Sequence, residues 1–164
     1  MVKFFISAKN GGLEKAEFFK DTCWVDMVNP TDDECEDVSA VSGVPEYMIK
    51  AALDEEERAR ADFDDGCSMF ILDCPIIEET ASGDSYTTLP LAVIYNDKCI
   101  VTVCLKGNNV LKEFIVGREK IFCGKPVHFA LTFMMGNAKR FSYSPDSRQP
   151  VRPCKIFHAR VRLN

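Results

Sequence analysis

Residues Cys67–Ile77 form a nearly continuous apolar run, and this run constrains the fold more than any other feature of the sequence. Because odd and even positions are both apolar, the run predicts a central strand covered on both faces, as in a sheet with helices on each side. Pro75 lies inside the run and cannot donate a ladder hydrogen bond, so we expect the pairing to end or bulge there. The run contains Asp73 and falls short of the roughly 18 apolar residues that a membrane-spanning helix requires. Met1–Asn10 lacks the apolar run of a secretory signal, so the chain as given is expected to be soluble.

The sequence before this run predicts two strands and then two helices. Asn29-Pro30 ends the second strand, and Thr31 and Glu34 have the three-residue spacing of a capping box at a helix start. Gly43 can adopt the left-handed conformation that closes this helix, and Pro45 is acceptable in the first turn of the next helix. The predicted strands are Val2–Ile6 and Thr22–Val28, and the inner stripe of the second helix is Met48, Ile49, Ala52 and Leu53.

The sequence after the run predicts two more strands and two more helices. Glu78–Tyr86 is polar and predicts a loop. Thr87–Tyr95 and Cys99–Cys104 are separated by a short turn, so we expect them to pair antiparallel. Val110–Gly117 and Pro126–Arg140 predict helices, with Leu111, Phe114 and Ile115 inward in the first and Phe129, Phe133 and Met134 inward in the second. The order of elements predicts an α/β fold in which helices pack on a mixed sheet.

The cysteines are predicted to be reduced and buried. No two of them have C-x-x-C spacing, and the chain has only two histidines, so the paired-ligand pattern of a structural zinc site is absent. Several lie within or beside apolar stretches, where a reduced thiol behaves as a small hydrophobic side chain. This usage favours a reducing compartment. The eight are Cys23, Cys35, Cys67, Cys74, Cys99, Cys104, Cys123 and Cys154.

Charge is distributed unevenly along the chain. The net charge is −5, which argues against a nucleic-acid partner, because phosphate binding needs a concentrated basic face. Residues 141–164 hold five basic residues and one acidic residue, a balance of +4, so residues 1–140 carry −9. We therefore expect a domain at 1–140 and a basic tail rich in Pro and Arg at 141–164. The tail is either a disordered extension or the product of a shifted reading frame that replaced a continuing helix, and we favour the second.

Two acidic groups are candidate cation sites. Asp54-Glu55-Glu56-Glu57 could attract a divalent cation at a subunit seam, but consecutive residues at a helix end point in different directions. At most two of them could share one ion without another chain. The alternative, which we favour, is a solvated helix terminus whose acids pair locally with Arg58 and Arg60. A second group lacks the spacing and the distal Glu of an EF-hand and predicts a plain turn; it consists of Asp62, Asp64 and Asp65.

Catalytic function finds little support in the sequence. There is no Gly-rich phosphate loop and no Gly-x-Ser-x-Gly motif, and His128 on a predicted helix is expected to be structural. We predict no catalytic and no cofactor-binding residue. A carboxylate enzyme built on Asp54–Glu57 is a weaker hypothesis, which would require a convergent pair of buried acids.

Four motifs occur in an order that is typical of one transporter family. Trp24-Val25-Asp26-Met27-Val28-Asn29-Pro30-Thr31 resembles the strand-to-helix entry in the N-terminal cytoplasmic domain of CorA-like magnesium/cobalt transporters. Gly43-Val44-Pro45, followed by Ala52–Arg60, is similar to the next part of that domain. Thr88-Leu89-Pro90-Leu91 and Ile100-Val101-Thr102-Val103 fall where the family places its later strands. The resemblance covers about residues 2–140.

The resemblance implies an α/β/α sandwich with a central mixed sheet, which acts as a cytoplasmic regulatory and assembly domain of a Mg²⁺ transporter. Whole members of the family have a stalk helix and two membrane helices, assemble as pentamers and conduct magnesium, with cobalt and nickel as other cations. The Gly-Met-Asn tripeptide of their pore mouth is absent, since Met135-Gly136-Asn137 has the wrong order. We therefore expect a soluble fragment that lies at the cytoplasmic face of the membrane in the whole protein, reaches the membrane only through missing C-terminal helices and is not transport-competent alone.

The resemblance does not supply a metal site for this chain. In some family members a carboxylate on the second helix helps to hold a regulatory cation between subunits, but Ala51 stands at that place, beside Lys50. Neither side chain can coordinate magnesium, which takes oxygen ligands. The metal-site residues are therefore unknown, no cofactor is required, and any Mg²⁺ is expected to bind weakly at subunit interfaces. The alternative function is a stand-alone interaction or cation-sensor module with the same sandwich fold.

Overall fold

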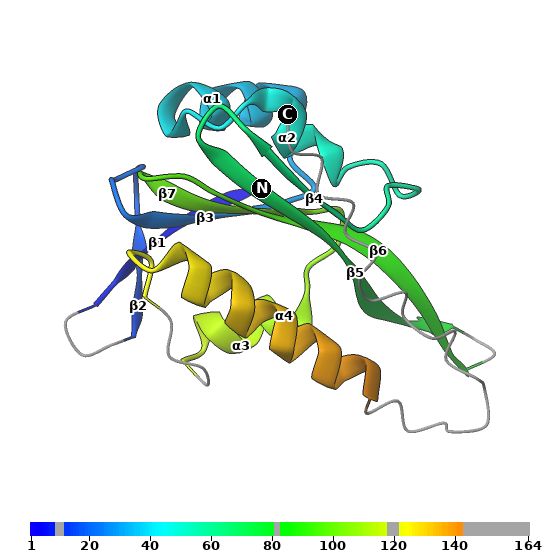
Figure 1. The fold of residues 1–164 in the computed structure, drawn as a ribbon. Helices are drawn as coiled ribbons and strands as arrows, with labels where there is room; N and C mark the ends of the chain where they lie inside the picture. The colour runs from blue at the N-terminus through cyan, green and yellow to red at the C-terminus, as the bar shows by residue number, and fades with distance from the viewer. Residues whose placement is uncertain (9–11, 81–82, 118–121, 143–164) are drawn as a thin grey trace.

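The computed structural model describes residues 1–8, 12–80, 83–117 and 122–142 as a mixed sheet between two layers of helices (Figure 1). Helices α1 (Asp32–Ser42) and α2 (Glu46–Ala51) cover one face of the sheet, and α3 (Asn109–Ile115) and α4 (Pro126–Ser142) cover the other. This arrangement confirms the predicted α/β/α sandwich. The predicted tail beyond Ser142 lies outside the described residues, so the boundary at residue 140 stays a prediction.

The sheet of the described residues has seven strands, in the order β2-β1-β3-β7-β6-β5-β4. Only β3 and β7 run parallel, with Cys23 opposite Cys99 and Val28 opposite Cys104. All other neighbours are antiparallel, which confirms the predicted pairing of β6 with β7. The strands are β1 (Val2–Ser7), β2 (Leu13–Ala16), β3 (Cys23–Val28), β4 (Arg60–Asp64), β5 (Cys67–Thr80), β6 (Gly83–Tyr95) and β7 (Cys99–Cys104).

Each face of the sheet has its own apolar core. Alternate residues of β3 point to opposite faces, so Val25 belongs to the core beneath α1 and α2, whereas Trp24 belongs to the core beneath α3 and α4. The Trp24 ring packs against Phe5 and Phe129, with centroids 5.0 and 5.1 Å away. Phe114 and Phe133 complete this second core, as the sequence predicts for the inner sides of α3 and α4.

The helix boundaries follow from local side-chain chemistry. Thr31 Oγ1 accepts a hydrogen bond from the Glu34 N–H at 3.2 Å, and the Glu34 carboxylate accepts one from the Thr31 N–H at 3.0 Å. This reciprocal pair is the predicted capping box. Gly43 ends α1 at a φ of 73°, which L side chains rarely adopt. Asn108 caps α3, because its Oδ1 accepts from the N–H groups of Val110 and Leu111.

Strand β5 is not the central strand that the sequence predicts, although its residues contribute to the apolar cores on both faces of the sheet. It lies second from the sheet edge, and the centre is β7, whose six residues are all buried. On one face of β5, Met69 and Ile71 are buried, whereas Phe70 on the other face is only half-buried. There the Phe70 ring lies 6.1 Å from Phe63 on β4 and 6.2 Å from Tyr95 on β6. On this second face Phe70 packs among aromatic side chains of neighbouring strands, and Cys74 is buried in the core beneath α3 and α4.

The hairpin of β5 and β6 is longer than predicted. Pro75 does not end the ladder, since it lies opposite Thr88 in continuous register. Strand β4 pairs with β5 only as far as Ile71, so Pro75 lies where β5 has one neighbour in the described residues and where a missing N–H is tolerated. The predicted loop at Glu78–Tyr86 is therefore wrong. The strands extend to Thr80 and resume at Gly83, because cross-strand pairing supports polar residues in a hairpin.

The edge strands β2 and β4 were not predicted, because β2 has no apolar alternation and the alternation in β4 is limited to Ala61 and Phe63 among charged residues. Each pairs with a single neighbouring strand: β2 pairs with β1, and β4 pairs with β5. The predicted turn after β4 is confirmed: Asp65 and Gly66 have φ values of 48° and 73°, as a tight hairpin turn requires. The sequence therefore predicted the turn but not the strand before it.

Candidate functional site

The acidic segment after α2 has the local partners of a solvated helix end. Asp54, Glu55 and Glu56 are exposed, and Asp54 Oδ1 accepts a hydrogen bond from the Glu56 N–H at 3.0 Å. Glu57 forms an ion pair with Arg60 and accepts a hydrogen bond from the backbone N–H of Arg58 at 2.8 Å. No two acids of this segment form a convergent buried pair, which was the condition for a carboxylate enzyme here.

The second acidic group lies only partly in the predicted turn, because Asp62 and Asp64 belong to strand β4 and only Asp65 lies in the turn. Asp62 Oδ1 accepts from the N–H of Phe63, and Asp65 lies in the turn. Asp64 has a partner that the sequence did not indicate, because the Tyr47 hydroxyl donates to its Oδ2 at 2.6 Å. This hydrogen bond to a carboxylate raises the pKa of Tyr47 to about 12. Tyr47 therefore ties α2 to the β4–β5 turn.

Ala51, at the position where the resemblance places a regulatory carboxylate, lies beside a network of ion pairs between α1 and α2. Ala51 is half-buried at the end of α2. The neighbouring Lys50 Nζ lies 2.6 Å from Asp32 Oδ1 at the start of α1 and 2.8 Å from Glu46 Oε1. These two hydrogen bonds raise the pKa of Lys50. The lysine therefore supplies a positive charge between the two helices from within the chain.

The described residues do not form a metal centre within one copy of the chain. No group of three or more His, Cys, Asp or Glu side chains is placed there to hold an ion. The carboxylates nearest to Ala51 in the ion-pair network, Asp32 and Glu46, are engaged by Lys50. Within the described ranges, one copy therefore offers no cluster of oxygen ligands of the kind that magnesium takes.

The helix N-termini at the carboxyl ends of the parallel strands are capped by side chains of the chain itself. Ligands of open α/β sheets bind outside such strand ends, where helix N-termini can hold anions. Here α1 follows β3 and α3 follows β7, but Thr31 and Asn108 already accept from the free N–H groups. Asp32, Asp33 and Glu34 add negative charge to the first turn of α1. This end of the sheet is therefore unsuited to bind an anion.

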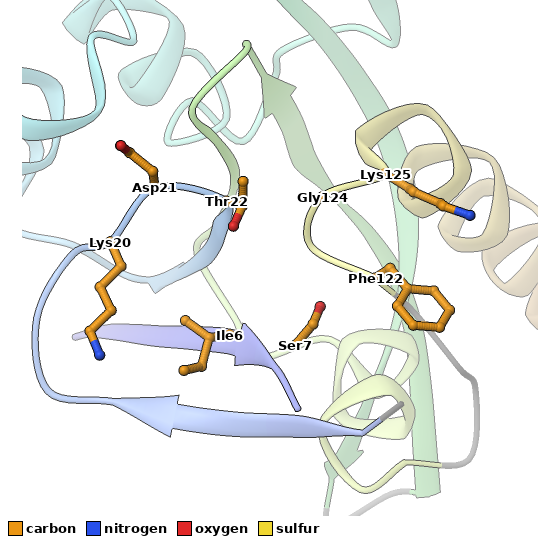
Figure 2. A pocket seen from close by; sticks show the side chains of 8 residues that line it. All are labelled: Ile6, Ser7, Lys20, Asp21, Thr22, Phe122, Gly124 and Lys125. Carbon is orange, nitrogen blue, oxygen red and sulfur yellow. The ribbon is translucent and has the colours of Figure 1, made fainter. Parts of the chain in front are cut away.

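A hollow of about 550 Å³ lies between the β2–β3 connection and the segment before α4 (Figure 2). Lys20 and Lys125 line it, but Figure 2 shows their side chains pointing away from one another. Ser7 Oγ is engaged, because it accepts a hydrogen bond from the Cys123 N–H at 2.8 Å. The hollow therefore presents no convergent set of polar groups for a substrate.

A buried carboxylate lies in the centre of the sheet, on the face covered by α3 and α4. Asp26 on β3 is 4% exposed, and Thr102 Oγ1 on β7 donates to its Oδ1 at 3.1 Å. The Trp24 indole N–H in turn donates to Thr102 Oγ1 at 2.9 Å. Burial raises the pKa of Asp26, although Thr102 and Lys3 oppose the rise. This network joins the two parallel strands.

The surface that the sequence analysis missed lies on α4. Val127, Leu131 and Met135 follow one another at intervals of four residues, and they are 55, 55 and 63% exposed. Helical residues with this spacing form a stripe on one side of the helix. The opposite side of α4 is buried through Phe129 and Phe133, so the helix is apolar on two sides. Such a pattern is typical of a helix that packs against two partners, and the spacing was visible in the sequence.

This stripe is the candidate functional surface of the chain. We call Val127, Leu131 and Met135 the α4 stripe. Single exposed apolar residues are common on proteins, but an apolar row along a helix marks an interaction surface. In the described part of the chain, no helix combines the length and the hydropathy that crossing a bilayer requires.

Comparisons with known proteins identify the fold. Residues 19–131 match the model of a family described as CorA-like Mg²⁺ transporter protein. The soluble domain of CorA from Methanocaldococcus jannaschii has a similar structure, with a TM-score of 0.69 and 18% identity, over 87% of this chain and 57% of that chain. The complete CorA magnesium transporter from the same organism gives a TM-score of 0.66 and 16% identity, over 87% of this chain and 45% of that chain.

The ZntB cytoplasmic domain from Vibrio parahaemolyticus also has a similar structure. Its TM-score is 0.64 at 14% identity, over 85% of this chain and 58% of that chain. The chain therefore spans about half the length of these solved structures. No curated protein matches the chain by sequence.

Proposed function

Because this chain belongs to the CorA-like Mg²⁺ transporter protein family, we propose that it is the cytoplasmic regulatory and assembly domain of a divalent cation transporter. The solved structures that it matches are about twice as long as the matched part. We assign the passage of ions to segments beyond that part, and to this domain the association of copies at the cytoplasmic face of the membrane. Magnesium is the cation that the family description suggests.

The α4 stripe is the observation that carries the assembly role. Its three side chains are more than half exposed, and α4 is packed on the sheet through its other side. Removing such side chains from water when two copies meet is favourable, at about 25 cal/mol per Å² of apolar surface. An apolar row that is exposed in this way favours a domain that packs against another surface.

A regulatory cation, in this proposal, is held weakly between copies and not within one copy. Lys50 already provides a positive charge to Asp32 and Glu46, and Ala51 offers no oxygen ligand. The exposed acids Asp54, Glu55 and Glu56 remain available to a second chain. Each of them could add one oxygen ligand to a site completed across an interface.

Sedimentation velocity over a range of concentrations tests the proposed function, with and without millimolar MgCl₂. We expect the weight-average sedimentation coefficient of the full chain to rise with concentration. Calorimetric titration with MgCl₂ should show weak binding under conditions where oligomers form. A chain that stays monomeric at every concentration and is indifferent to magnesium would contradict the proposal and favour a stand-alone module.

A further inference from the structure

Strand β5 has an open edge beyond the point where β4 ends. The ladder between the two strands stops at Arg60 opposite Ile71, whereas β5 continues to Thr80 in register with β6. In the described part of the chain, no strand lies on the other side of this stretch of β5. We call residues 73–79 the open edge. An edge of this kind presents backbone N–H and C=O groups to which a further strand can bind.

The positions of two prolines show which backbone groups point outward from the open edge. Pro75 on β5 lies opposite Thr88, and Pro90 on β6 lies opposite Asp73. Hydrogen-bonded and non-hydrogen-bonded positions alternate in an antiparallel pair, and proline has no N–H to exchange with its partner. These are therefore the non-hydrogen-bonded positions, and the backbone groups of Asp73 and Pro75 point away from β6. Because Ile77 lies two residues further on, its N–H and C=O also point outward.

The side chain of Asn137 on α4 already binds one of these outward groups. Its Nδ2 donates to the Asp73 carbonyl at 2.9 Å, as the N–H of a neighbouring strand would. Asn137 is 6% exposed, and its Oδ1 is buried without a hydrogen-bond donor in the described residues. A buried acceptor without a donor is unfavourable, because it has given up its bonds to water. A donor is therefore missing beside Asp73, and the backbone N–H of a further strand can supply it.

The two faces beside the open edge determine which strand fits there. Cys74 is buried in the core beneath α3 and α4, so this face takes apolar side chains. Asp73 alternates with Cys74 and points to the opposite face, where it is half-buried. Burial raises the pKa of Asp73, and no ion pair joins its carboxylate within the described ranges. A fitting strand therefore alternates apolar side chains with basic ones.

The sequence of residues 157–163 has this alternation. Every second residue is apolar, and a histidine and two arginines occupy the positions between. A period of two residues is typical of a strand with one apolar and one polar face. We call residues 157–163 the tail segment. Its apolar residues are Phe157, Ala159, Val161 and Leu163, and the residues between them are His158, Arg160 and Arg162.

The tail segment is close enough along the chain to reach the open edge. Helix α4 ends at Ser142, five residues after the Asn137 contact with β5. The fourteen residues 143–156 connect this end to the tail segment. An extended chain spans about 3.3 Å per residue, so the connection reaches up to about 46 Å. The open edge itself is only about 20 Å long.

We propose that the tail segment binds to the open edge as a further strand of the same chain. Its apolar side chains pack beside Cys74, its arginines approach Asp73, and one of its backbone N–H groups donates to Asn137 Oδ1. The contact lies within one copy, so it is independent of the proposed assembly role. It holds for either origin of the tail, and it closes an edge that strands of other chains would otherwise meet.

Hydrogen exchange of single amides, followed by NMR in the full chain, tests this contact. The outward N–H of Ile77 should be protected in the wild type. Val161→Pro removes a donor and disfavours pairing in the middle of the tail segment, so the Ile77 amide should exchange at least about tenfold faster. Gln149→Pro, in the connection, is the matched control and should exchange like the wild type. The amides of β7 check that each variant keeps the fold.

Charge reversal gives a second and independent readout. Arg160→Glu with Arg162→Glu places like charges beside Asp73, so the Ile77 amide should again exchange faster. Lys155→Glu changes a charge of the same sign outside the tail segment and should have no such effect. Backbone chemical shifts of residues 157–163 in the wild type should be those of a strand.

Three results would overturn the inference. The first is an Ile77 amide that is unprotected in the wild type or exchanges equally fast in Val161→Pro and the wild type. The second is a set of random-coil chemical shifts for the tail segment. The third is protection of Ile77 that appears only at high protein concentration, because the open edge would then pair with a second copy.

Discussion

Asp26 is a single residue whose burial should make the stability of the domain depend on pH. Burial raises its pKa above the ordinary value of 3.8, so the folded chain binds a proton more tightly than the unfolded chain. Stability therefore falls as pH rises from about 4 through the raised pKa, by about 1.4 kcal/mol for each unit of the shift.

Asp26→Asn removes this charge and keeps an oxygen that can accept from Thr102. We expect the stability of the variant, relative to the wild type, to increase between pH 5 and pH 8, as measured by urea unfolding followed through Trp24 fluorescence. Glu14→Gln, at an exposed carboxylate on β2, is the matched control and should follow the wild type. Equal differences at both pH values would contradict the assignment.

Tyr47 gives a second residue-scale prediction, at alkaline pH. Its pKa is about 12 because the hydroxyl donates to Asp64, and the ordinary value is 10.0. Because the folded value is the higher one, the stabilisation from this hydrogen bond is complete below pH 10 and is lost as pH rises through about 12.

Replacing Asp64 with Asn should lower the pKa of Tyr47 toward 10. Ultraviolet titration of tyrosinate measures this, with Tyr47→Phe subtracted so that the other tyrosines cancel. An unchanged Tyr47 titration in Asp64→Asn would show that the carboxylate is not the cause. The variant also separates the Tyr47 contact from the acidic turn itself, because Asp62 and Asp65 remain.

At the scale of elements, the packing of α3 against α4 depends on Gly136. A Cβ atom at this position would lie 2.9 Å from Val110 Cγ1, closer than side chains normally approach. In an open helix Gly→Ala stabilises by about 1 kcal/mol, but Val110 is β-branched and can rotate little. We therefore expect Gly136→Ala to destabilise the domain by about 1–3 kcal/mol.

A double-mutant cycle with Val110→Ala checks this explanation. Removing the Val110 methyl groups makes room for the new Cβ, so Gly136→Ala should cost less, or become stabilising, in that background. The measurement is the free energy of unfolding in urea for the four chains. Additive effects of the two substitutions would show that the close approach is not what keeps glycine at this position.

The elements differ in how far the sequence could predict them. Helix α1 was predictable in full, because its strand breaker, capping box and left-handed glycine are local signals. The centre of the sheet was not, since β5 and β7 are both apolar and only pairing with β3, across more than 70 residues, makes β7 central. Strands β2 and β4 are polar edges whose conformation is set by their neighbours.

The residues of the candidate site could be predicted from the sequence more completely than their contacts. The carboxylates of residues 54–57 and of the β4–β5 turn were found from the sequence, but their partners depend on how α2 meets the sheet. Lys50 was noted only for what it cannot bind, and its contact with Asp32 required the fold. The α4 stripe has a four-residue spacing that periodicity could have revealed, yet which side of α4 is exposed depends on the sheet beneath it.

At the scale of the whole molecule, the thiols should be protected by the fold. The cysteines of the described residues are all buried, and burial raises the pKa of Cys99 and Cys104 to about 12. Little reactive thiolate is then present at pH 8. These cysteines are Cys23, Cys35, Cys67, Cys74, Cys99, Cys104 and Cys123.

In a Cys154→Ser chain at pH 8, we therefore expect iodoacetamide to leave the native protein almost unmodified within an hour. In urea, where the chain is unfolded, the reagent should add seven carbamidomethyl groups, one at each remaining cysteine. Intact-mass spectrometry counts the groups. Rapid native modification of any of the seven would show that its part of the domain opens readily. This outcome would locate the opening by the cysteine concerned.

The parallel pairing of β3 with β7 has a consequence for folding during synthesis on the ribosome. Trp24 and Thr102, which join these strands, are 78 positions apart in the sequence. While the chain leaves the ribosome, β1, β2 and β3 can pair early, but the inner edge of β3 must wait until β7 has been synthesised. During that interval an apolar strand edge is open to other chains, which exposes nascent copies to non-native strand pairing.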